Sequence, residues 1–360
     1  MKPTIWFRST RERYDQLFSP MSSQLQENLI FIGITTYNRL DLLRESVLSI
    51  LNQTYKTFIL VISNDNPERV LTLENLTLPF DSRIVIVNQR RNLGEIANLN
   101  WLMNYAQAPY FTWLADDDLL HPDYLRIMVN ELNKDPKLPA VFSNYIHGVI
   151  PPDHFSRPVV AVPVTISSEN FLLLYSARKL QLIGCYGLFR IEEIRRIGGF
   201  IQLGKGFSPG SDTLIPILLA ANSVIRYVDI PLVYLRTHDD SVSSTSSDLQ
   251  AYISAEYDFL RFLRAIIEKF SHDLQSQVIR NFREWFMENH LSVLYRDLTL
   301  SRTARNITFM RVEIGNNYRI AKEFGFLLVN INLFFKAMRL AILRTLQESW
   351  VRKLRNGMRK

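Results

Sequence analysis

Three consecutive aspartates, Asp116, Asp117 and Asp118, are the residues of this sequence best suited to bind a cation. They follow the apolar run PYFTWLA, residues 109–115, which predicts a buried strand. A single aspartate at such a strand end would cap the next helix, because helix N-termini attract carboxylates. Three like charges repel one another unless a positive group lies among them. We therefore favour a metal or cation site over a capping loop.

Polar residues also follow three other predicted strands, which cover residues 29–37, 57–63 and 83–89. The side chains at these strand ends are Thr35, Tyr37 and Asn38, then Asp65, then Arg91. Ligands of open α/β sheets bind outside the carboxyl ends of the strands, so four polar strand ends together predict a ligand crevice. These side chains suit a nucleotide diphosphate. A carboxylate can bind the base or the ribose, an arginine can bind polar groups of the ligand, and the adjacent acids can hold a divalent cation.

The elements between these strands predict how the residues are positioned. Apolar residues at helical spacing predict helices over 38–53 and 93–107. Strands alternating with helices indicate right-handed βαβ units, and hence an α/β fold with a Rossmann-like, mostly parallel sheet flanked by helices. We also expect strands at 140–150 and 185–191, a helix at 212–222 that is kinked or broken near Pro216, and a strand pair or one bent strand over 224–238.

Long helical stretches replace this alternation after Ser241. We therefore expect three parts: an N-terminal extension over 1–28, the α/β domain over 29–244 and a helical C-terminal appendage over 245–360.

The composition limits the classes of protein to consider. Of 360 residues, 47% are hydrophobic and 21% are charged, which is typical of a folded protein. The single cysteine, Cys185, excludes an internal disulfide and favours a reducing compartment. The N-terminus lacks a signal-peptide pattern, and no apolar stretch approaches the roughly 20 residues that span a bilayer. We therefore expect a cytoplasmic protein.

The basic charge lies in one segment. Residues 336–360 contain eight Lys or Arg and one Glu, which accounts for the whole net charge of +7. The remainder is neutral, which argues against a nucleic-acid partner. Phe335, Ile342, Leu346 and Trp350 share one helical face of the tail, so two interpretations stay open: a helix at the inner face of an anionic membrane, or a helix packed on the domain.

The predicted crevice has no glycine-rich phosphate loop. The first strand carries only Gly33, so neither the G-x-G-x-x-G pattern of dehydrogenases nor a P-loop is present. A divalent cation held by the aspartates is then the available counter-charge for a diphosphate, and magnesium or manganese suits such oxygen ligands.

Motifs in the expected order resemble the family 2 glycosyltransferases with the GT-A fold. These motifs are IGITTYNRLDLLRESVLSILNQTY, VISNDNPE, RNLGEIANLNWLM, FTWLADDDLLHPDYL, RIEEIRRIGGF, PGSDTLIPILL and YLRTHDDSVSS. The resemblance covers about residues 29–245. It implies a nucleotide-sugar donor with UDP or dTDP favoured, a carbohydrate or lipid-linked acceptor, and a role in polysaccharide or glycolipid synthesis.

The resemblance also implies a role for individual residues. The donor would be bound by Thr35, Tyr37, Asn38, Asp65, Arg91 and Asp116, with Asp65 accepting from the base and Asp116 meeting the ribose or the metal. Asp117 or Asp118 would hold magnesium or manganese, and His238 would reach the metal or the diphosphate. Asp212 would be the catalytic base, and direct displacement would invert the anomeric carbon.

Three positions depart from the family pattern. Asn64 replaces the first aspartate after the second strand, Ser211 replaces the usual glutamate, and Ala115 leaves the assignment within the aspartate triplet open. Asp229, Asp239 and Asp240 are the fallback candidates for the base. A nucleotide-sugar-binding module without activity and a nucleotidyltransferase stay open as alternative functions.

Overall fold

The computed structural model describes residues 27–160, 162–238 and 248–300. Its first part alternates strands and helices, as expected from the hydrophobic pattern. The elements are β1 (Ile30–Thr36), α3 (Leu40–Leu51), β2 (Phe58–Asn64), β3 (Ile84–Asn88), α4 (Glu95–Tyr105) and β4 (Tyr110–Ala115). The predicted strands and helices of this part are thus confirmed to within a few residues.

The second part contains shorter elements. They are β5 (Leu119–Leu120), α5 (Tyr124–Asn133), β6 (Ala140–Gly148), η1 (Asp153–Ser156), β7 (Pro163–Ile166), α6 (Ser168–Ser176), η2 (Gly184–Tyr186), β8 (Leu188–Arg190), α7 (Ile191–Arg196), α8 (Ser211–Ala220) and β9 (Ile225–Arg236). The strand expected over 185–191 is only three residues long, because η2 and α7 take its two ends. Helix α8 continues through Pro216.

Nine strands of the described residues form one sheet in the order β3-β2-β1-β4-β8-β6-β9-β5, with β7 paired to β9. Strands β3, β2, β1 and β4 are parallel. Strand β8 is antiparallel to both β4 and β6, and β6 is parallel to β9, so β9 ends at the same edge of the sheet as β1. The expected α/β, Rossmann-like sheet flanked by helices is confirmed.

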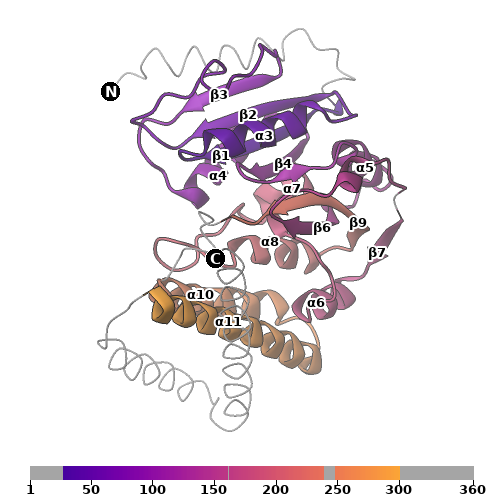
Figure 1. Cartoon of the computed structure of the whole chain (residues 1–360). Helices are drawn as coiled ribbons and strands as arrows, with labels where there is room; N and C mark the ends of the chain where they lie inside the picture. Colours follow the sequence, from indigo (N-terminus) through magenta and orange to yellow (C-terminus); the bar gives the residue numbers. More distant parts are fainter. Residues whose placement is uncertain (1–26, 161, 239–247, 301–360) are drawn as a thin grey trace, which may run out of the picture.

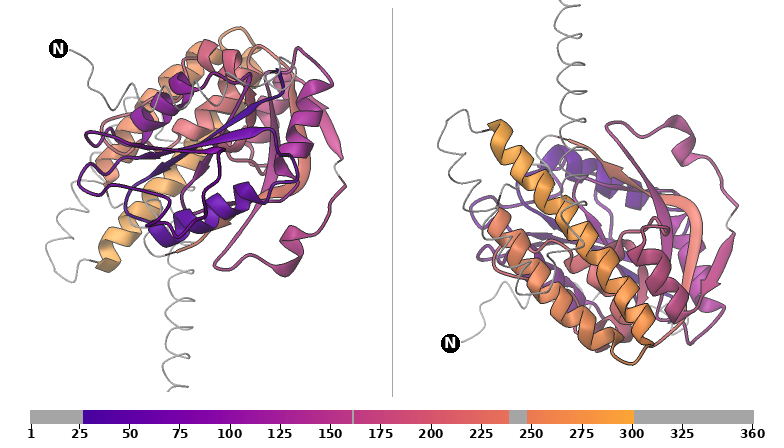
Figure 2. Two further views of the ribbon diagram at one scale, coloured as in Figure 1. Left: turned by 90° about the horizontal axis from the view of Figure 1, so that it is seen from above. Right: turned by 90° about the horizontal axis from the view of Figure 1, so that it is seen from below.

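Strand β1 lies between β2 and β4. The chain therefore runs from β1 to β2 and β3 on one side, and then crosses back to β4 on the other side of β1. Right-handed crossovers in opposite directions place α3 and α4 on opposite faces of the sheet, as Figure 2 shows from above. Residues of β1, β2 and β4, such as Phe31, Leu60 and Phe111, are fully buried between these layers.

The C-terminal helices α10 (Leu249–Ile267) and α11 (His272–Leu300) lie side by side below α8 and α6 (Figure 1). They share a second apolar core with the α/β part, in which Phe259 and Phe286 meet Leu214 and Leu172. The domain boundary at 244/245 stays a prediction. No helix in the described ranges is both long and apolar enough to cross a membrane. The extension 1–26 and the basic tail lie outside the described residues.

Candidate active site

The predicted site residues gather where β1 and β4 end, at the point where the strand order reverses. Thr36 closes β1 and pairs with Asn64 of β2, while Ala115 closes β4 beside Thr35. Clefts form at such switch points because the following loops run in opposite directions. The aspartate turn directly follows Ala115, so the topology brings it beside the loop after β1.

Asp116 and Asp117 share a positive partner that the sequence analysis did not identify. Nη1 of Arg39 lies 3.2 Å from Oδ1 of Asp116 and 2.8 Å from Oδ2 of Asp117. Thr36 also donates its hydroxyl to Asp116, at 2.6 Å. Burial raises the pKa of Asp116, whereas the bonds from Thr36 and Arg39 lower it. Arg39 directly follows the TTYN turn in the sequence, whereas its closeness to Asp116 and Asp117 is visible only in the folded chain.

His238 also reaches the aspartate turn. Its Nε2 lies 2.9 Å from Oδ2 of Asp117, because β9 ends at the same edge of the sheet as β4. This contact brings together two of the three predicted metal ligands. Among the residues that the structure describes, however, no group of three or more His, Cys, Asp or Glu side chains is arranged to hold a metal.

Asp118, the third predicted metal ligand, lies apart from the other two. Its carboxylate accepts a hydrogen bond from the hydroxyl of Tyr186 and another, at 2.8 Å, from the backbone N–H of Arg236. Burial raises the pKa of Asp118 to about 7, and repulsion from Asp117 adds to this effect. The three aspartate side chains therefore point in different directions, and the carboxylate of Asp118 is hydrogen-bonded to Tyr186 and Arg236 instead of pointing toward Asp117.

Arg236 fixes the back of this turn. In addition to its backbone bond to Asp118, its Nε donates to the carbonyl oxygen of Asp117 at 3.0 Å. Its guanidinium also pairs with Glu45 on α3. Arg236 thus joins β9, the aspartate turn and α3, a role that no local sequence signal indicated.

Asp65 organises the start of α4. Both of its oxygens accept backbone N–H groups, from Leu93 at 2.8 Å and from Gly94 at 2.9 Å. Burial raises its pKa, and these two bonds lower it. Asn64, the departure from the family pattern, instead donates to the carbonyl oxygen of Arg69 and to Asn88. Asp65 therefore shapes the predicted base pocket as well as lying in it.

The other predicted donor residues line the same edge. Tyr37 is 51% exposed and Arg91 is exposed, so both are accessible to a ligand. Thr35 accepts a hydrogen bond from the indole of Trp113, and Asn38 accepts one from Asn66. These four side chains therefore lie at or after the carboxyl ends of β1 and β3.

Asp212 stands at the start of α8, after Gly210, which has the positive φ of 87° that ends the preceding loop. Burial raises the pKa of Asp212, and hydrogen bonds with Thr213 lower it. The chain packs tightly behind it: a Cβ on Gly184 would lie 1.8 Å from the carbonyl oxygen of Asp212. The backbone of Asp212 is therefore held in place mainly by close packing.

Glu95 connects the two sides of the site. It is the first residue of α4. Desolvation raises the pKa of its carboxylate, repulsion from Asp212 and Asp117 adds to this effect, and Arg39 lowers the pKa. Asp212 and the aspartate turn consequently lie within electrostatic range of one residue. Nothing in the sequence distinguishes Glu95, because a glutamate in a first helical turn is common.

The fallback bases differ in position. Asp229 lies within β9 and accepts a hydrogen bond from Asn144 at 2.9 Å. Asp239 and Asp240 lie outside the described residues. Among the candidate bases that the structure describes, Asp212 is the one in the first turn of a helix, α8.

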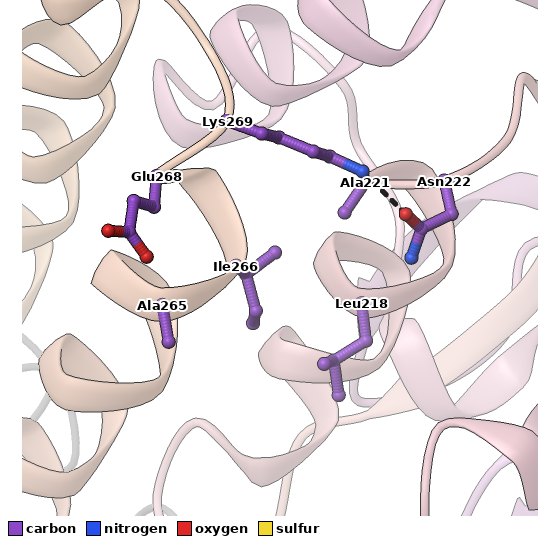
Figure 3. Close-up of a pocket in the computed structure, with 7 residues that line it drawn as sticks. All are labelled: Leu218, Ala221, Asn222, Ala265, Ile266, Glu268 and Lys269. Atoms are coloured by element: carbon purple, nitrogen blue, oxygen red, sulfur yellow. Dashed lines mark hydrogen bonds between the residues drawn. The ribbon is translucent and has the colours of Figure 1, made fainter.

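A separate cavity of about 440 Å³ lies between the C-terminal ends of α8 and α10 (Figure 3). It is lined by Leu218, Ala221, Asn222, Ala265, Ile266, Glu268 and Lys269. The Lys269 ammonium bonds to Asn222 across it. Asp212 is at the other end of α8, so this cavity is distinct from the cleft.

Comparison with protein families agrees with this geometry. Residues 31–182 match the family described as Glycosyl transferase family 2. An uncharacterized glycosyltransferase of Rickettsia typhi is 26% identical over 254 residues, which cover 68% of this chain and 75% of the relative. Another, from Rickettsia felis, is 32% identical over 175 residues, and the match spans 28% of its length and 48% of this chain.

Solved structures share the fold. S. aureus TarS 1–349 in complex with UDP-GlcNAc superposes with a TM-score of 0.52 at 15% identity, over 73% of this chain and 72% of that one. The same protein without that ligand gives a TM-score of 0.51. The likeness confirms a GT-A glycosyltransferase fold, and at this identity it concerns the fold alone.

Proposed function

We infer that this chain, which matches glycosyl transferase family 2 over residues 31–182, transfers a sugar from a nucleotide-diphosphate sugar to an acceptor hydroxyl. We base this proposal on the aspartate turn after β4, where Asp117 contacts Arg39 and His238, together with Asp212 at the start of α8. A transferase needs a site for the leaving diphosphate and a base for the acceptor on either side of one sugar. In this proposal the aspartate turn supplies the diphosphate site, and Asp212 supplies the base.

For the donor, we propose that the base lies against Tyr37 and Asp65, with Thr35, Asn38 and Arg91 around it. Asp116, held by Thr36, is placed for the ribose. UDP or dTDP is the favoured nucleotide, and the UDP-GlcNAc bound by the TarS protein of the same fold supports UDP.

For the metal, we propose that Asp117 and His238 supply the protein ligands. Magnesium and manganese take one or two carboxylates and complete their shell with phosphate and water oxygens, so Asp117 suits either ion, and the imidazole of His238 would add a nitrogen ligand. Such an ion would offset the charge of the departing diphosphate. Arg39 pairs with Asp116 and Asp117 in this structure, and we propose that it contacts the phosphates when the donor binds.

For the acceptor, we propose that Asp212 takes the proton of the attacking hydroxyl. Burial raises its pKa, which makes its carboxylate a stronger base than that of an exposed aspartate. Attack from the Asp212 side, opposite the diphosphate on the turn side, would invert the anomeric carbon. The acceptor is a carbohydrate or a lipid-linked sugar in this proposal.

A product assay tests the proposal. The purified chain is incubated with manganese, a panel of radiolabelled nucleotide sugars and candidate acceptors, and the released nucleotide is identified. Release of nucleoside diphosphate with labelled acceptor supports the transferase. Pyrophosphate release would indicate the nucleotidyltransferase instead, and tight donor binding without any product would indicate the binding module.

We further propose that the segment 336–360 makes peripheral contact with an anionic membrane at its inner face. Basic residues near such a surface contribute about 1 kcal/mol each. Full-length protein should sediment with anionic liposomes at low salt, and protein lacking 336–360 should not. Failure of the full-length protein to sediment would favour the packed helix.

A further inference from the structure

The loop 201–210, which leads into α8, rests directly on the C-terminal helices. The backbone N–H of Gly204 donates to Oδ2 of Asp258 on α10, at 2.9 Å. Gly204 has a φ of +63°, and a Cβ there would lie 2.3 Å from the hydroxyl of Ser254 and 2.9 Å from the backbone nitrogen of Ala255. The loop backbone thus touches α10 where a side chain would not fit.

Apolar contacts hold the same loop on both sides of Gly204. Leu203 is fully buried in the second core, with Phe259 of α10 and Phe282 of α11. The ring of Phe207 meets that of Tyr252 edge to face, with centroids 5.6 Å apart. Asp258 is therefore a polar contact within an otherwise apolar attachment of this loop.

The loop is closed at its base, so its position is transmitted to α8. The N–H of Leu203 donates to the hydroxyl of Ser208 at 2.7 Å, and the hydroxyl of Ser211 donates to the carbonyl oxygen of Ile201 at 2.7 Å. Ser211 is the first residue of α8 and precedes Asp212. A shift of the loop on α10 would consequently move the candidate base.

We propose that Asp258 is a positioning residue for Asp212, acting by holding the loop 201–210 on α10 through the N–H of Gly204. The inference rests on the proposed function only for the role of Asp212 as base. It gives the helical appendage a part in the acceptor side of the reaction: α10 fixes the geometry of the base, while the donor side is built without it.

The first test does not depend on activity. Amide hydrogen exchange of the full chain, metal-free and at one pH, is compared among wild type, Asp258→Ala, Asp258→Asn and Arg261→Ala. Arg261 pairs with Asp258 at 3.4 Å, so its removal tests the ion pair without the loop contact. We expect exchange over 203–214 to be at least several-fold faster in Asp258→Ala only, since asparagine keeps the acceptor oxygen. Unchanged exchange in Asp258→Ala would overturn the proposal.

The second test uses transfer and donor binding together. In Asp258→Ala we expect kcat to fall about tenfold, while the affinity and stoichiometry of nucleoside diphosphate binding stay at wild-type values. A general loss of folded protein would instead lower the stoichiometry, and it would contradict the positioning role. If wild type transfers no sugar, the proposed function fails, and the exchange result still decides whether Asp258 holds the loop.

Discussion

The two sides of the cleft are held in place by different forces. On the proposed donor side, Asp65, Asp116 and Asp117 each accept two or more hydrogen bonds or ion pairs from defined partners. On the acceptor side, Asp212 interacts with its neighbour Thr213, and its backbone is fixed by close packing against Gly184.

This difference has a functional consequence. Charged groups held by hydrogen bonds form a preorganised electrostatic site, which suits a constant ligand such as a nucleotide diphosphate. A residue held by packing depends on the shape of its surroundings, which changes with the loops and helices behind it. The donor side should therefore tolerate changes in the C-terminal helices, and the acceptor side should not.

The largest expected effect is on the acceptor side. Asp212→Asn keeps the size and the capping capacity of the side chain but removes its basicity, so sugar transfer should fall by about 10² to 10⁴ while donor binding stays normal. Because burial raises the pKa of Asp212, the acid limb of kcat in wild type should lie above the usual aspartate range. Transfer within a few-fold of wild type would point to Asp229, Asp239 or Asp240 instead.

A second effect concerns stability on the donor side. The folded pKa of Asp118 is about 7, far above the ordinary value near 3.9, so the folded state binds the proton more tightly. The contribution of Asp118 to wild-type stability should then fall as pH rises from about 4 to about 8 and stay level above that. Asp118→Asn cannot ionise, and it should be about 2–4 kcal/mol more stable than wild type at pH 8.

Urea unfolding at pH 4.5 and pH 8, in chelator, measures this difference. Asparagine can still accept the Arg236 N–H, so the variant should match or fall slightly below wild type at pH 4.5. Equal pH slopes in the two proteins would show that Asp118 is ionised in the fold, and would remove one contrast between the two sides.

A third effect separates the metal from the base. Asp117→Ala removes one proposed metal ligand, so affinity for nucleoside diphosphate in manganese should fall about 10- to 100-fold, as changes at metal sites commonly do. The remaining affinity should be insensitive to chelator. Glu192→Ala, at an exposed helix position, is the matched control. Wild-type affinity that is equal with and without metal would contradict the proposed cation.

The smallest effect tests packing directly. Gly184→Ala forces a Cβ against the backbone of Asp212 and should cost about 1–3 kcal/mol of stability and reduce transfer, with donor affinity kept. Gly33→Ala on β1 is the comparison, since its Cβ would meet the movable side chain of Leu102 at 3.0 Å. Equal losses in both variants would mean that packing constrains the two sides alike.

The sequence predicted the donor half of the fold well, because its determinants are local. Alternating apolar strands and amphipathic helices defined β1 to β4, and the strand ends identified Asp65 and the aspartate turn. The strand β7 was missed: Pro163–Ile166 is a short edge strand whose middle residues are exposed, and Pro163 interrupts the apolar run over 159–166. Short elements of this kind depend on pairing with a distant strand, here β9.

The directions of the three aspartates could not be predicted from the sequence. Adjacent residues in a turn point in different directions, and the partners that fix them, Arg39 and Arg236, lie far away along the chain. The same limit applies to Asp258, whose partner Gly204 is 54 residues away. Motifs identified which residues gather at the cleft, whereas their pairing became visible only in the folded chain.

The path of β9 has a consequence for how the protein is made. The first four parallel strands can pair once residues up to 115 have left the ribosome, because all their partners lie within that segment. Arg236 and His238 arrive more than a hundred residues later, when β9 inserts beside β6 and β5. Until then the aspartate turn lacks two of its partners, so we expect a nascent chain ending before β9 to be folded in its first half but catalytically silent.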